Sequence, residues 1–471
     1  MRLSLLLALV TLLAACYTAG PEYSKPHEPI PIAFKESGPW RDALPSDAIN
    51  RGPWWELYQD PSLNLLEQAA LRGNLRLQAA MLRVDQARAL ARAADADRAP
   101  RANLDSWAGR IHASKNRPDE PQKVLNEYTA DLFRVPITAS YEIDLWGKLK
   151  RGGEAALARA QASEASYVLV LFSLQAEVAQ TYFAIRTLDR EALLVREGVQ
   201  LRERMRDLVA ARVRGGLSSE LDLARSDAEL ASTSAEVFSL LRRRADLEAA
   251  LAVLLGMPPE NFSMPEMTAD LRAPLIPPGL PSELLERRPD IAEAERMLAA
   301  RNAEIGLAKA AFFPSIRLTG ALGFESVDLE KLLDRDSLIW AAGPSISLPL
   351  FDGGRRRAEA ERAKAAFDEQ MMYYREKLLV AFKEVESGLS GLRLLNEQSD
   401  AHALAVSSAR RSVKLAETRF QAGLVLFLEV ADAQRTALSA ERVATQINGQ
   451  QLAVSVALIK ALGGGWSGVK S

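Results

Sequence analysis

The sequence is poor in the residues from which most catalytic and metal sites are built. It has one cysteine and three histidines in 471 residues, and His27, His112 and His402 are far apart along the chain. A single cysteine excludes a disulfide framework within the chain, and a zinc site of nitrogen and sulfur ligands lacks candidates. We also find no Ser/His/Asp or Cys/His set and no paired carboxylates in a predicted pocket. We therefore expect no enzymatic activity, no metal and no cofactor.

An excess of one charge is also missing. The 59 Lys and Arg residues and 61 Asp and Glu residues leave a formal net charge of -2. Polyanion-binding proteins usually carry a basic excess on one face, so we expect no nucleic-acid partner. The hydrophobic fraction of 48% is close to the average of globular proteins. Beyond the N-terminus no run reaches 18 apolar residues, which argues against a membrane-spanning helix in the mature protein.

The N-terminus has the features of a secretory signal peptide over residues 1–15. Arg2 precedes an apolar run, which ends in Ala14-Ala15-Cys16. Residues 13–16 resemble a bacterial lipobox, which implies that Cys16 is lipidated and becomes the first residue. An ordinary signal peptide with a chance cysteine is the alternative. Tyr17, in place of an aspartate after the cysteine, favours the outer membrane by resemblance to lipoprotein sorting rules.

The rest of the chain contains an internal repeat. The sequence RVRGGL at 212–217 reappears as RFQAGL at 419–424, at a separation of 207 residues. Further upstream, Ala99-Pro100 corresponds to Phe313-Pro314 at a separation of 214, so the halves differ by a short insertion. A fixed period of this kind indicates two copies of one structural unit.

Each unit is predicted to contain a helix, two strands, a long helix, a tight turn and a final helix. Neither 147–212 nor 353–420 contains proline, so each is expected to form a helix of roughly 100 Å. Helices of this length suggest an extended coiled-coil bundle. Gly215, Gly216 and Gly423 are expected to end them, because glycine adopts the left-handed conformation of a helix C-cap.

Three segments show the period of two that is typical of strands, about 131–145, 315–327 and 338–351, and a fourth, about 102–115, shows it less regularly. Apolar residues outward to lipid and polar residues inward to a lumen would give this pattern, but so would a soluble, half-buried sheet. Topology favours the membrane. Four strands cannot close a barrel, and open sheet edges are not tolerated in hydrocarbon. Three chains would supply twelve strands around a channel.

Several motifs together make the chain similar to the TolC-like outer-membrane factors, in particular to their lipidated OprM/NodT branch. The motifs are ERRPDI at 286–291, FFPSIRLTG at 312–320, LPLFDGGR at 348–355 and ALGGGW at 461–466. The resemblance covers essentially the full chain. It implies an α+β membrane protein: a trimeric 12-stranded transmembrane β-barrel, with four strands per chain, on a 12-helix periplasmic α-barrel with a small equatorial domain.

The resemblance also implies a division of the chain. The expected segments are the signal peptide 1–15, a lipidated N-terminal and equatorial segment 16–61, repeat 1 at 62–256, a Pro-rich equatorial linker 257–282, repeat 2 at 283–464 and a C-terminal tail 465–471. The function implied is passive exit of small molecules such as drugs through a tripartite RND-type efflux pump. The partners implied are a periplasmic adaptor, an inner-membrane pump that selects the cargo, and outer-membrane lipid. A duct for type I protein secretion, or a periplasmic coiled-coil scaffold without a pore, are the alternatives.

Site residues carried over from the resemblance lie at the expected periplasmic tip. Family members have acidic rings there that narrow the closed pore, and the matching positions are Glu429 and Asp432. Two solvated carboxylates near a helix N-terminus would be the simpler explanation. Asp222 and Asp227 are the candidates in the first repeat. The residues expected to dock the partner are those of the two turns: Gly216, Leu217, Gly423, Leu424 and Val425.

This sequence departs from the family pattern at the second turn. The turn is more apolar than the usual serine-containing version, and Phe420 replaces a common tyrosine. That puts a hydrogen-bonded lock carried over from relatives in doubt, and the apolar turn suggests a docking patch instead.

Two other motifs are interpreted structurally. Asp290 is expected to start a helix, and Asp352-Gly-Gly-Arg355 lacks the Lys-Ser/Thr ending of a phosphate loop.

Overall fold

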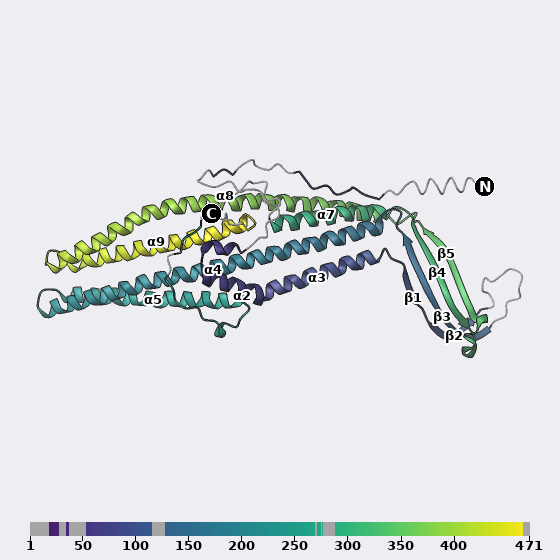
Figure 1. The fold of residues 1–471 in the computed structure, drawn as a ribbon, viewed down its shortest axis with the longest axis horizontal. Coiled ribbons are helices and arrows are strands. Elements are labelled where there is room, and N and C mark those ends of the chain that lie inside the picture. Colours follow the sequence, from purple (N-terminus) through teal and green to yellow (C-terminus); the bar gives the residue numbers. More distant parts are fainter. Residues whose placement is uncertain are drawn as a thin grey trace. The chain divides into compact units, whose positions relative to one another are not determined.

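The computed structural model describes residues 18–27, 34–36, 53–114, 128–268, 271–274, 276 and 288–464. The signal peptide 1–15, Cys16, the motif residues 286–287 and the tail 465–471 lie outside the described residues. The described chain combines long helices with one antiparallel sheet, which confirms the predicted mixture of helix and strand (Figure 1). The longer helices are α2 (Pro61–Gly73), α3 (Leu75–Ala96), α4 (Lys148–Arg214), α5 (Glu220–Leu254), α7 (Pro289–Ala310), α8 (Arg355–Gln421) and α9 (Phe427–Ala461).

The helices occur in pairs of equal length. Helices α4 and α8 have 67 residues each, α5 and α9 have 35 each, and α3 and α7 have 22 each. The starts of α4 and α8 differ by 355 − 148 = 207 residues, and those of α5 and α9 by 427 − 220 = 207. The starts of α3 and α7 differ by 289 − 75 = 214. These separations equal the two offsets found in the sequence.

The chain forms two compact units, and each is assembled from three separate segments. Unit 1 contains residues 1–26, 84–163 and 294–374, and unit 2 contains residues 27–83, 164–293 and 375–471. Each half of the sequence therefore contributes to both units, because the long helices α4 and α8 continue from one unit into the other.

Unit 1 contains the sheet. Strands β1 (Arg101–Leu104) and β2 (Trp107–Ala113) both pair with β3 (Tyr128–Ile143), which pairs with β4 (Ser315–Ser326), which pairs with β5 (Leu338–Ser347). All of these pairings are antiparallel. Short 3-10 turns, Leu329–Lys331 and Arg335–Ser337, connect β4 to β5.

The first predicted strand, 102–115, is wrong as a single element, because the structure divides it into β1 and β2. The register is the same on both sides of the break, with Leu104 opposite Ile137 and Trp107 opposite Arg134. Pro136 explains the interruption. Its carbonyl accepts from the N–H of Asp105 at 3.0 Å, but proline has no N–H to return. The ladder therefore loses one bond at this point and resumes two residues later.

A strap of chain, residues 18–24, is fixed onto the helices of unit 1. Ala19 donates its N–H to the carbonyl of Trp146 at 2.9 Å, and Asn302 donates its side-chain N–H to the carbonyl of Pro21 at 3.1 Å. Tyr23 donates its hydroxyl to Glu295 at 2.6 Å. Gly20 is necessary here, because a Cβ at that position would lie 2.4 Å from the Cα of Gly306. We call residues 18–24 the N-terminal strap.

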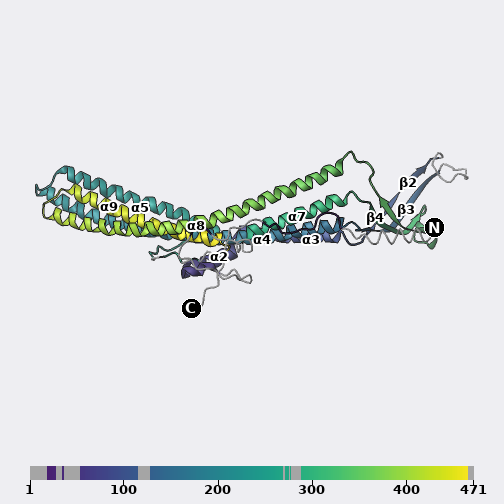
Figure 2. The ribbon, with the colours of Figure 1, turned by 90° about the horizontal axis from the view of Figure 1, so that it is seen from above.

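Unit 2 contains two helical hairpins, in which α5 runs beside the end of α4 and α9 beside the end of α8 (Figure 2). A buried polar and aromatic layer joins residues 54–60 to these hairpins. Trp54 donates its indole N–H to Gln175 at 3.1 Å, Tyr58 shares a hydrogen bond with Ser455 at 2.5 Å, and Tyr182 donates its hydroxyl to Asp60 at 2.5 Å. Asp60 also caps α2 by accepting from the backbone N–H of Ser62. Paired buried polar groups of this kind hold one specific packing arrangement.

The linker after α5 is held by charged side chains. Asp189, which is 3% exposed, pairs with Arg186 at 3.0 Å and with Arg244 at 2.6 Å. Arg244 also donates to the carbonyl of Met264 at 2.6 Å, and Arg186 to that of Pro265 at 2.8 Å. The guanidinium groups of Arg186 and Arg244 thus attach the linker to α4 and α5. The carboxylate of Asp189 balances their buried positive charge.

By length and composition alone, one helix among the described residues could cross a membrane. Helix α4 contains an 18-residue window with a mean hydropathy of 1.5, and half of that window is buried within the chain. A core helix of a soluble bundle passes the same test, and α8, of equal length, does not pass it. We therefore attribute the apolar character of α4 to packing.

Candidate functional site

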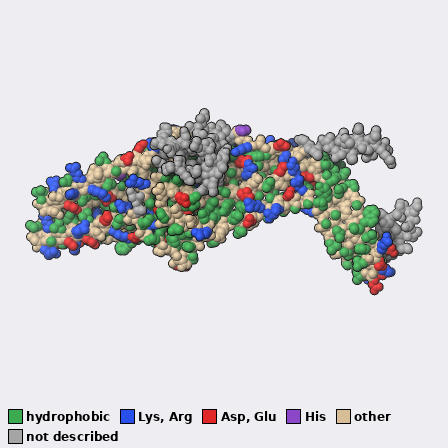
Figure 3. Space-filling view, in the orientation of Figure 1, with side chains coloured by type: hydrophobic (Ala, Val, Ile, Leu, Met, Phe, Trp, Pro, Cys, Tyr) green, Lys and Arg blue, Asp and Glu red, His purple; other side chains and the backbone are tan. Residues whose placement is uncertain are grey.

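The sheet of unit 1 has one apolar face. A row of side chains, Leu104, Ile137, Leu322 and Trp340, runs across four neighbouring strands in direct register. Trp340 and Ile346 are 74% and 70% exposed. Figure 3 shows hydrophobic side chains covering much of the surface over the strands. No described residue covers this face of the sheet. Its apolar surface is therefore available for contact with lipid or with another chain.

The opposite face of the sheet is polar. Arg134 and Glu325, which are directly opposite in the register, lie 3.3 Å apart, and Arg317 and Glu142 lie 3.4 Å apart. Ser345 donates its hydroxyl to the carbonyl of Arg317 at 3.3 Å. Trp107 is an exception, since its register places it on this polar face. Cross-strand ion pairs and hydroxyl bonds suit a face in contact with water.

Both edges of the sheet are open. Within the part of the chain that the structure describes, β1 and β2 pair only with β3, and β5 pairs only with β4. The outer backbone groups of β1, β2 and β5 therefore need partners from elsewhere in any environment without water.

The second candidate region is the pair of turns between the long and short helices. Gly216 and Gly423 have φ of 71° and 75°, which confirms the left-handed conformation predicted for both. Gly215 is not among the residues with positive φ. In each turn the residue after the glycine donates its N–H to a carbonyl five residues earlier: Leu217 to Arg212 at 2.8 Å and Leu424 to Arg419 at 2.9 Å. These are the bonds of a Schellman cap.

A small core lies beneath the turns and joins the two hairpins. Its buried members are Met205, Val209, Phe420, Phe427, Val430 and Ala431. Arg212 of the first hairpin donates to the carbonyl of Phe420 in the second at 2.8 Å. Its guanidinium also lies 4.5 Å from the centroid of the Phe420 ring. Phe420 is thus held by burial and by a cation–π contact with Arg212.

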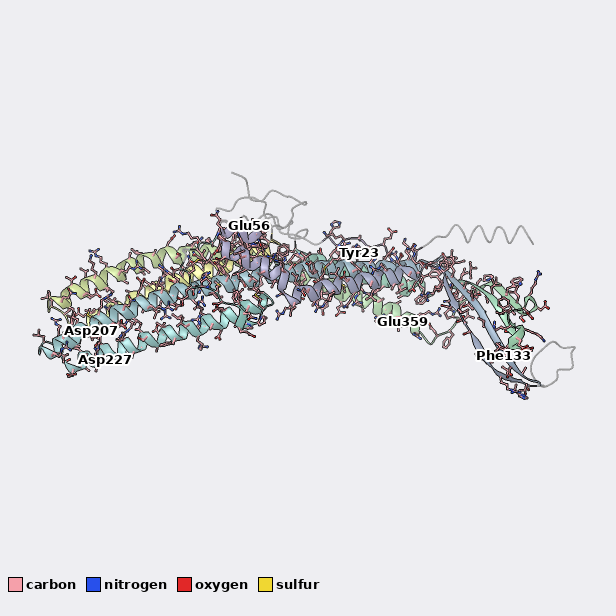
Figure 4. The ribbon with its side chains drawn as sticks, turned by 60° about the horizontal axis from the view of Figure 1, so that its bottom comes forward. Tyr23, Glu56, Phe133, Asp207, Asp227 and Glu359 are labelled. Atoms are coloured by element: carbon pink, nitrogen blue, oxygen red, sulfur yellow. The ribbon has the colours of Figure 1, made fainter. Side chains whose placement is uncertain are left out.

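The two acidic candidates of the first repeat are engaged locally. Asp222 accepts from the hydroxyls of Ser218 and Ser219 at 3.0 and 2.9 Å and forms a capping box at the start of α5. Burial opposes its ionisation, but these hydrogen bonds outweigh burial and lower the pKa of Asp222. Asp227 pairs with Arg206 at 2.9 Å, and Figure 4 shows it with Asp207 near this turn. Both carboxylates therefore have a structural explanation.

The candidates of the second repeat are more exposed. Glu429 lies in the first turn of α9, and Asp432 follows one turn later, 3.7 Å from Arg435. Arg435 also pairs with Glu229 of α5. Sequence reasoning missed Arg435, although its spacing of three residues from Asp432 predicts a contact on a helix. The structure thus places a positive charge beside one of the two candidate gate residues.

The turn residues proposed for docking differ in exposure. Leu217 and Leu424 are 75% and 69% exposed, whereas Val425 packs partly against the core beneath the turns. Leu426, which the sequence analysis did not select, is 70% exposed. The apolar surface at the turns is therefore centred on Leu217, Leu424 and Leu426.

Two other acidic residues have structural roles at helix starts: the sequence indicated this role for Asp290, and the structure adds it for Asp352. Asp290, in the first turn of α7, forms a bidentate pair with Arg288, with contacts of 3.0 and 2.8 Å. Burial opposes ionisation of Asp290, but Arg288 outweighs it and lowers the pKa. Asp352 accepts from the N–H groups of Gly354 and Arg356, and so caps the start of α8.

A sheet with one uncovered apolar face, joined to helices of this length, defines a class: channel subunits with a membrane-embedded sheet and an extended helical part. The sequence model described as "Outer membrane efflux protein" matches residues 66–257 and 280–464. The chain belongs to this family and is an outer-membrane efflux protein.

Individual relatives agree along nearly the whole chain. The pyoverdine export outer membrane protein OpmQ of Pseudomonas aeruginosa is 33% identical over 97% of this chain and 97% of its own length. The cation efflux system protein CusC of Escherichia coli O6:H1 is 32% identical over 96% of each chain. The structure of the outer-membrane channel OprN superimposes with a TM-score of 0.87 at 31% identity, covering 95% of this chain and 99% of that one.

Proposed function

We propose that three copies of the chain form one channel, in which twelve strands, with β1 and β2 counted as one interrupted strand, close a β-barrel and twelve helices close a periplasmic tunnel. The observation that carries this proposal is the sheet, which has two open edges and an uncovered apolar face. In a membrane, edges must be paired, and a closed barrel pairs them all. The interior of an eight-stranded barrel is filled by its own side chains. A barrel of twelve strands is wider and leaves room for a channel.

The two halves of the chain are proposed to be copies of one unit, each supplying a hairpin of strands and a hairpin of helices. Equal helix lengths, at offsets of 207 residues for two helix pairs and 214 for the third, support this. The family model also matches two stretches, whose ends at 257 and 464 are again 207 residues apart.

The channel is proposed to be the passive exit duct of a tripartite efflux pump, in contact with a periplasmic adaptor and an inner-membrane pump. Small molecules are the proposed cargo, and the pump, not the duct, selects them. The relatives support this division, because proteins named for pyoverdine export and for cation efflux are about equally similar to this chain. The exposed leucines Leu217, Leu424 and Leu426 are the proposed contact for the adaptor.

Lipidation at Cys16 is proposed to add an anchor to a protein that the barrel already holds in the membrane. The periplasmic gate is proposed to be Glu429 with Asp432. Of the alternatives, a pore-free scaffold does not require an uncovered apolar sheet, and a type I secretion duct would share the geometry described here.

The test is assembly and conductance. Outer membranes extracted in mild detergent should give a trimer band on a gel that heating converts to monomer, and the trimer should produce conductance steps in planar bilayers. A Cys16→Ser variant with an ordinary signal peptide should also give outer-membrane trimers. If the variant is found only as soluble monomer, the strands do not insert and the proposal is wrong.

A further inference from the structure

Arg202 is a buried charge without an ion pair. It lies on α4, in unit 2, and is 6% exposed. Its Nη1 atom donates to the carbonyl of Gly198 at 3.4 Å, which is a long bond within its own helix. No ion pair among the described residues includes Arg202. Burial lowers the pKa of its guanidinium, and the carboxylates of Glu229 and Glu236 oppose that shift. An unpaired buried charge is unfavourable, so this side chain needs an explanation.

The carboxylate that is best placed to pair with Arg202 is bonded to the other hairpin. Arg202 and Glu229 line one cavity of about 10 Å³ between α4, α5 and α9, which holds at most about one water molecule. Glu229, however, pairs with Arg435 of α9. One turn closer to the end of the hairpin, Arg206 of α4 pairs with Asp227 of α5 at 2.9 Å. The first hairpin thus has one matched pair and, at the next level, an arginine whose neighbouring carboxylate is bonded elsewhere.

Arg435 has a second acidic neighbour, on its own helix. Its guanidinium lies 3.7 Å from Asp432, one of the two candidate gate residues. Arg435 can therefore release the carboxylate of α5 and remain paired. By contrast, Arg442, one heptad further along α9, bridges two carboxylates of the first hairpin, Glu191 at 2.8 Å and Glu236 at 2.6 Å. The contact of Arg435 is thus the exchangeable one.

Two effects oppose each other where the hairpins meet. The core beneath the turns, which includes Met205, Phe420 and Phe427, stabilises the packing of one hairpin on the other. The unpaired charge of Arg202 favours their separation, because Glu229 could then pair with it. A junction that has two nearly balanced arrangements is the kind of element that switching proteins use.

We propose that Glu229 exchanges partners when the periplasmic end of the channel opens. In the arrangement described here, Glu229 pairs with Arg435 and Arg202 is unpaired. When α9 moves away from α5, Glu229 pairs with Arg202, and Arg435 pairs with Asp432, so that all four charges have partners. The exchange lowers the cost of opening, whereas the core beneath the turns opposes it. The link to opening rests on the proposed function, but the exchange itself takes place within one chain.

The experiment is a double-mutant cycle on the full-length protein in detergent, measured by calorimetry. Arg202→Met should raise the melting temperature, because it replaces an unpaired buried charge by an apolar side chain of similar length. In the Arg435→Met background the same change should lower the melting temperature, because Glu229 is then bonded to Arg202. The matched control is Arg204→Met, at an exposed position of α4, which should shift both backgrounds little and equally.

The sign of the shift decides the outcome. A reversal of sign between the two backgrounds is the expected result. Equal shifts caused by Arg202→Met in the two backgrounds, in either direction, would show that Glu229 does not change partners and would overturn the proposal.

Conductance in planar bilayers tests the link to opening. Arg202→Met trimers should spend roughly tenfold less time in the conducting state, whereas Arg435→Met trimers should conduct for more of the time than wild type. Equal conducting times in the two variants would contradict the link. A reversal of sign in protein that forms no conducting trimer would support the exchange and contradict the channel, so the two failures are distinguishable.

Discussion

Glu67 of α2 is a carboxyl group in the interior of unit 2. Its side chain is 0% exposed, and neither of its oxygens has a hydrogen-bond partner among the described residues. Burial raises the pKa of Glu67 to about 9, because an ionised carboxylate without a partner is costly in an apolar environment. The residue is therefore protonated at neutral pH in the folded chain and ionised in the unfolded one.

This difference makes stability depend on pH. In an unfolded chain the pKa of a glutamic acid is about 4.3, and folding raises that of Glu67. Below about pH 4.3 Glu67 is protonated in both states, so the stability of the folded chain is not reduced by ionisation of this group. Stability declines as pH rises toward 9, and the loss amounts to roughly 4 kcal/mol at pH 7. Glu67→Gln should therefore raise the melting temperature at pH 7–8 and change it little at pH 4.5, measured by calorimetry. Glu56→Gln, at an exposed neighbour, is the control; the same pH dependence in both variants would contradict the assignment.

Arg212 is a polar link between the two helical hairpins at their turns. It contributes one hydrogen bond to the carbonyl of Phe420 and a stacking contact with its ring, which together are worth about 1–2 kcal/mol. Arg212→Ala should speed amide hydrogen exchange in residues 418–426 by about tenfold, whereas Arg214→Ala, at an exposed position of the same turn, should not. Unchanged exchange in Arg212→Ala would show that the core beneath the turns alone holds the hairpins together.

At the scale of the elements, β4 offers a direct test of the two faces of the sheet. Leu322, near the middle of β4, lies on the apolar face opposite Trp340, and Thr319 lies on the polar face opposite Gly343. A charge on the lipid face of a barrel costs roughly 2–4 kcal/mol per chain near mid-membrane. Leu322→Arg should therefore sharply reduce the amount of trimer on an unheated gel, and Thr319→Arg should not. Equal losses in the two variants would indicate a sheet buried on both faces.

The elements themselves could be predicted where a local pattern determines them. Proline-free stretches predicted helices that the structure has at Lys148–Arg214 and Arg355–Gln421, and a period of two predicted the strands. The break between β1 and β2 was missed, because its cause, Pro136, is on the neighbouring strand and acts only through pairing. The strap was missed for the same kind of reason: Tyr23 and Glu295 are 272 residues apart in sequence.

For the candidate gate, too, local features could be predicted from the sequence and contacts between distant residues could not. The acidic positions follow from the resemblance, and the glycine turns before them from local conformation. The capping role of Asp222 could also have been predicted from the preceding serines. The pairing of Arg435 with Glu229 could not, because these residues are 206 apart in sequence and meet only through the packing of α9 on α5.

At the scale of the assembled molecule, the gate depends on charges that only a trimer brings together. If Glu429 and Asp432 face the axis, three chains place six carboxylates near one another. Arg435, 3.7 Å from Asp432, offsets part of that repulsion, so Glu429 should carry more of the unbalanced charge. A ring of one sign attracts the opposite ion, and a multivalent cation should therefore block the closed channel from the periplasmic side.

Single-channel conductance in planar bilayers, with a trivalent cation added on the periplasmic side, measures this block. The wild type should be closed by the cation, and Glu429→Ala/Asp432→Ala should stay conducting and leak more at rest, because the charge that binds the cation is gone. Glu429→Ala alone should lose more of the block than Asp432→Ala alone, since Arg435 already compensates Asp432. The control is Glu203→Ala/Asp207→Ala, two exposed acidic residues of α4 near the turn, which should be blocked like wild type. If the Glu429/Asp432 double variant is also blocked like wild type, the constriction is elsewhere, and Asp222 and Asp227 of the first repeat become the next candidates.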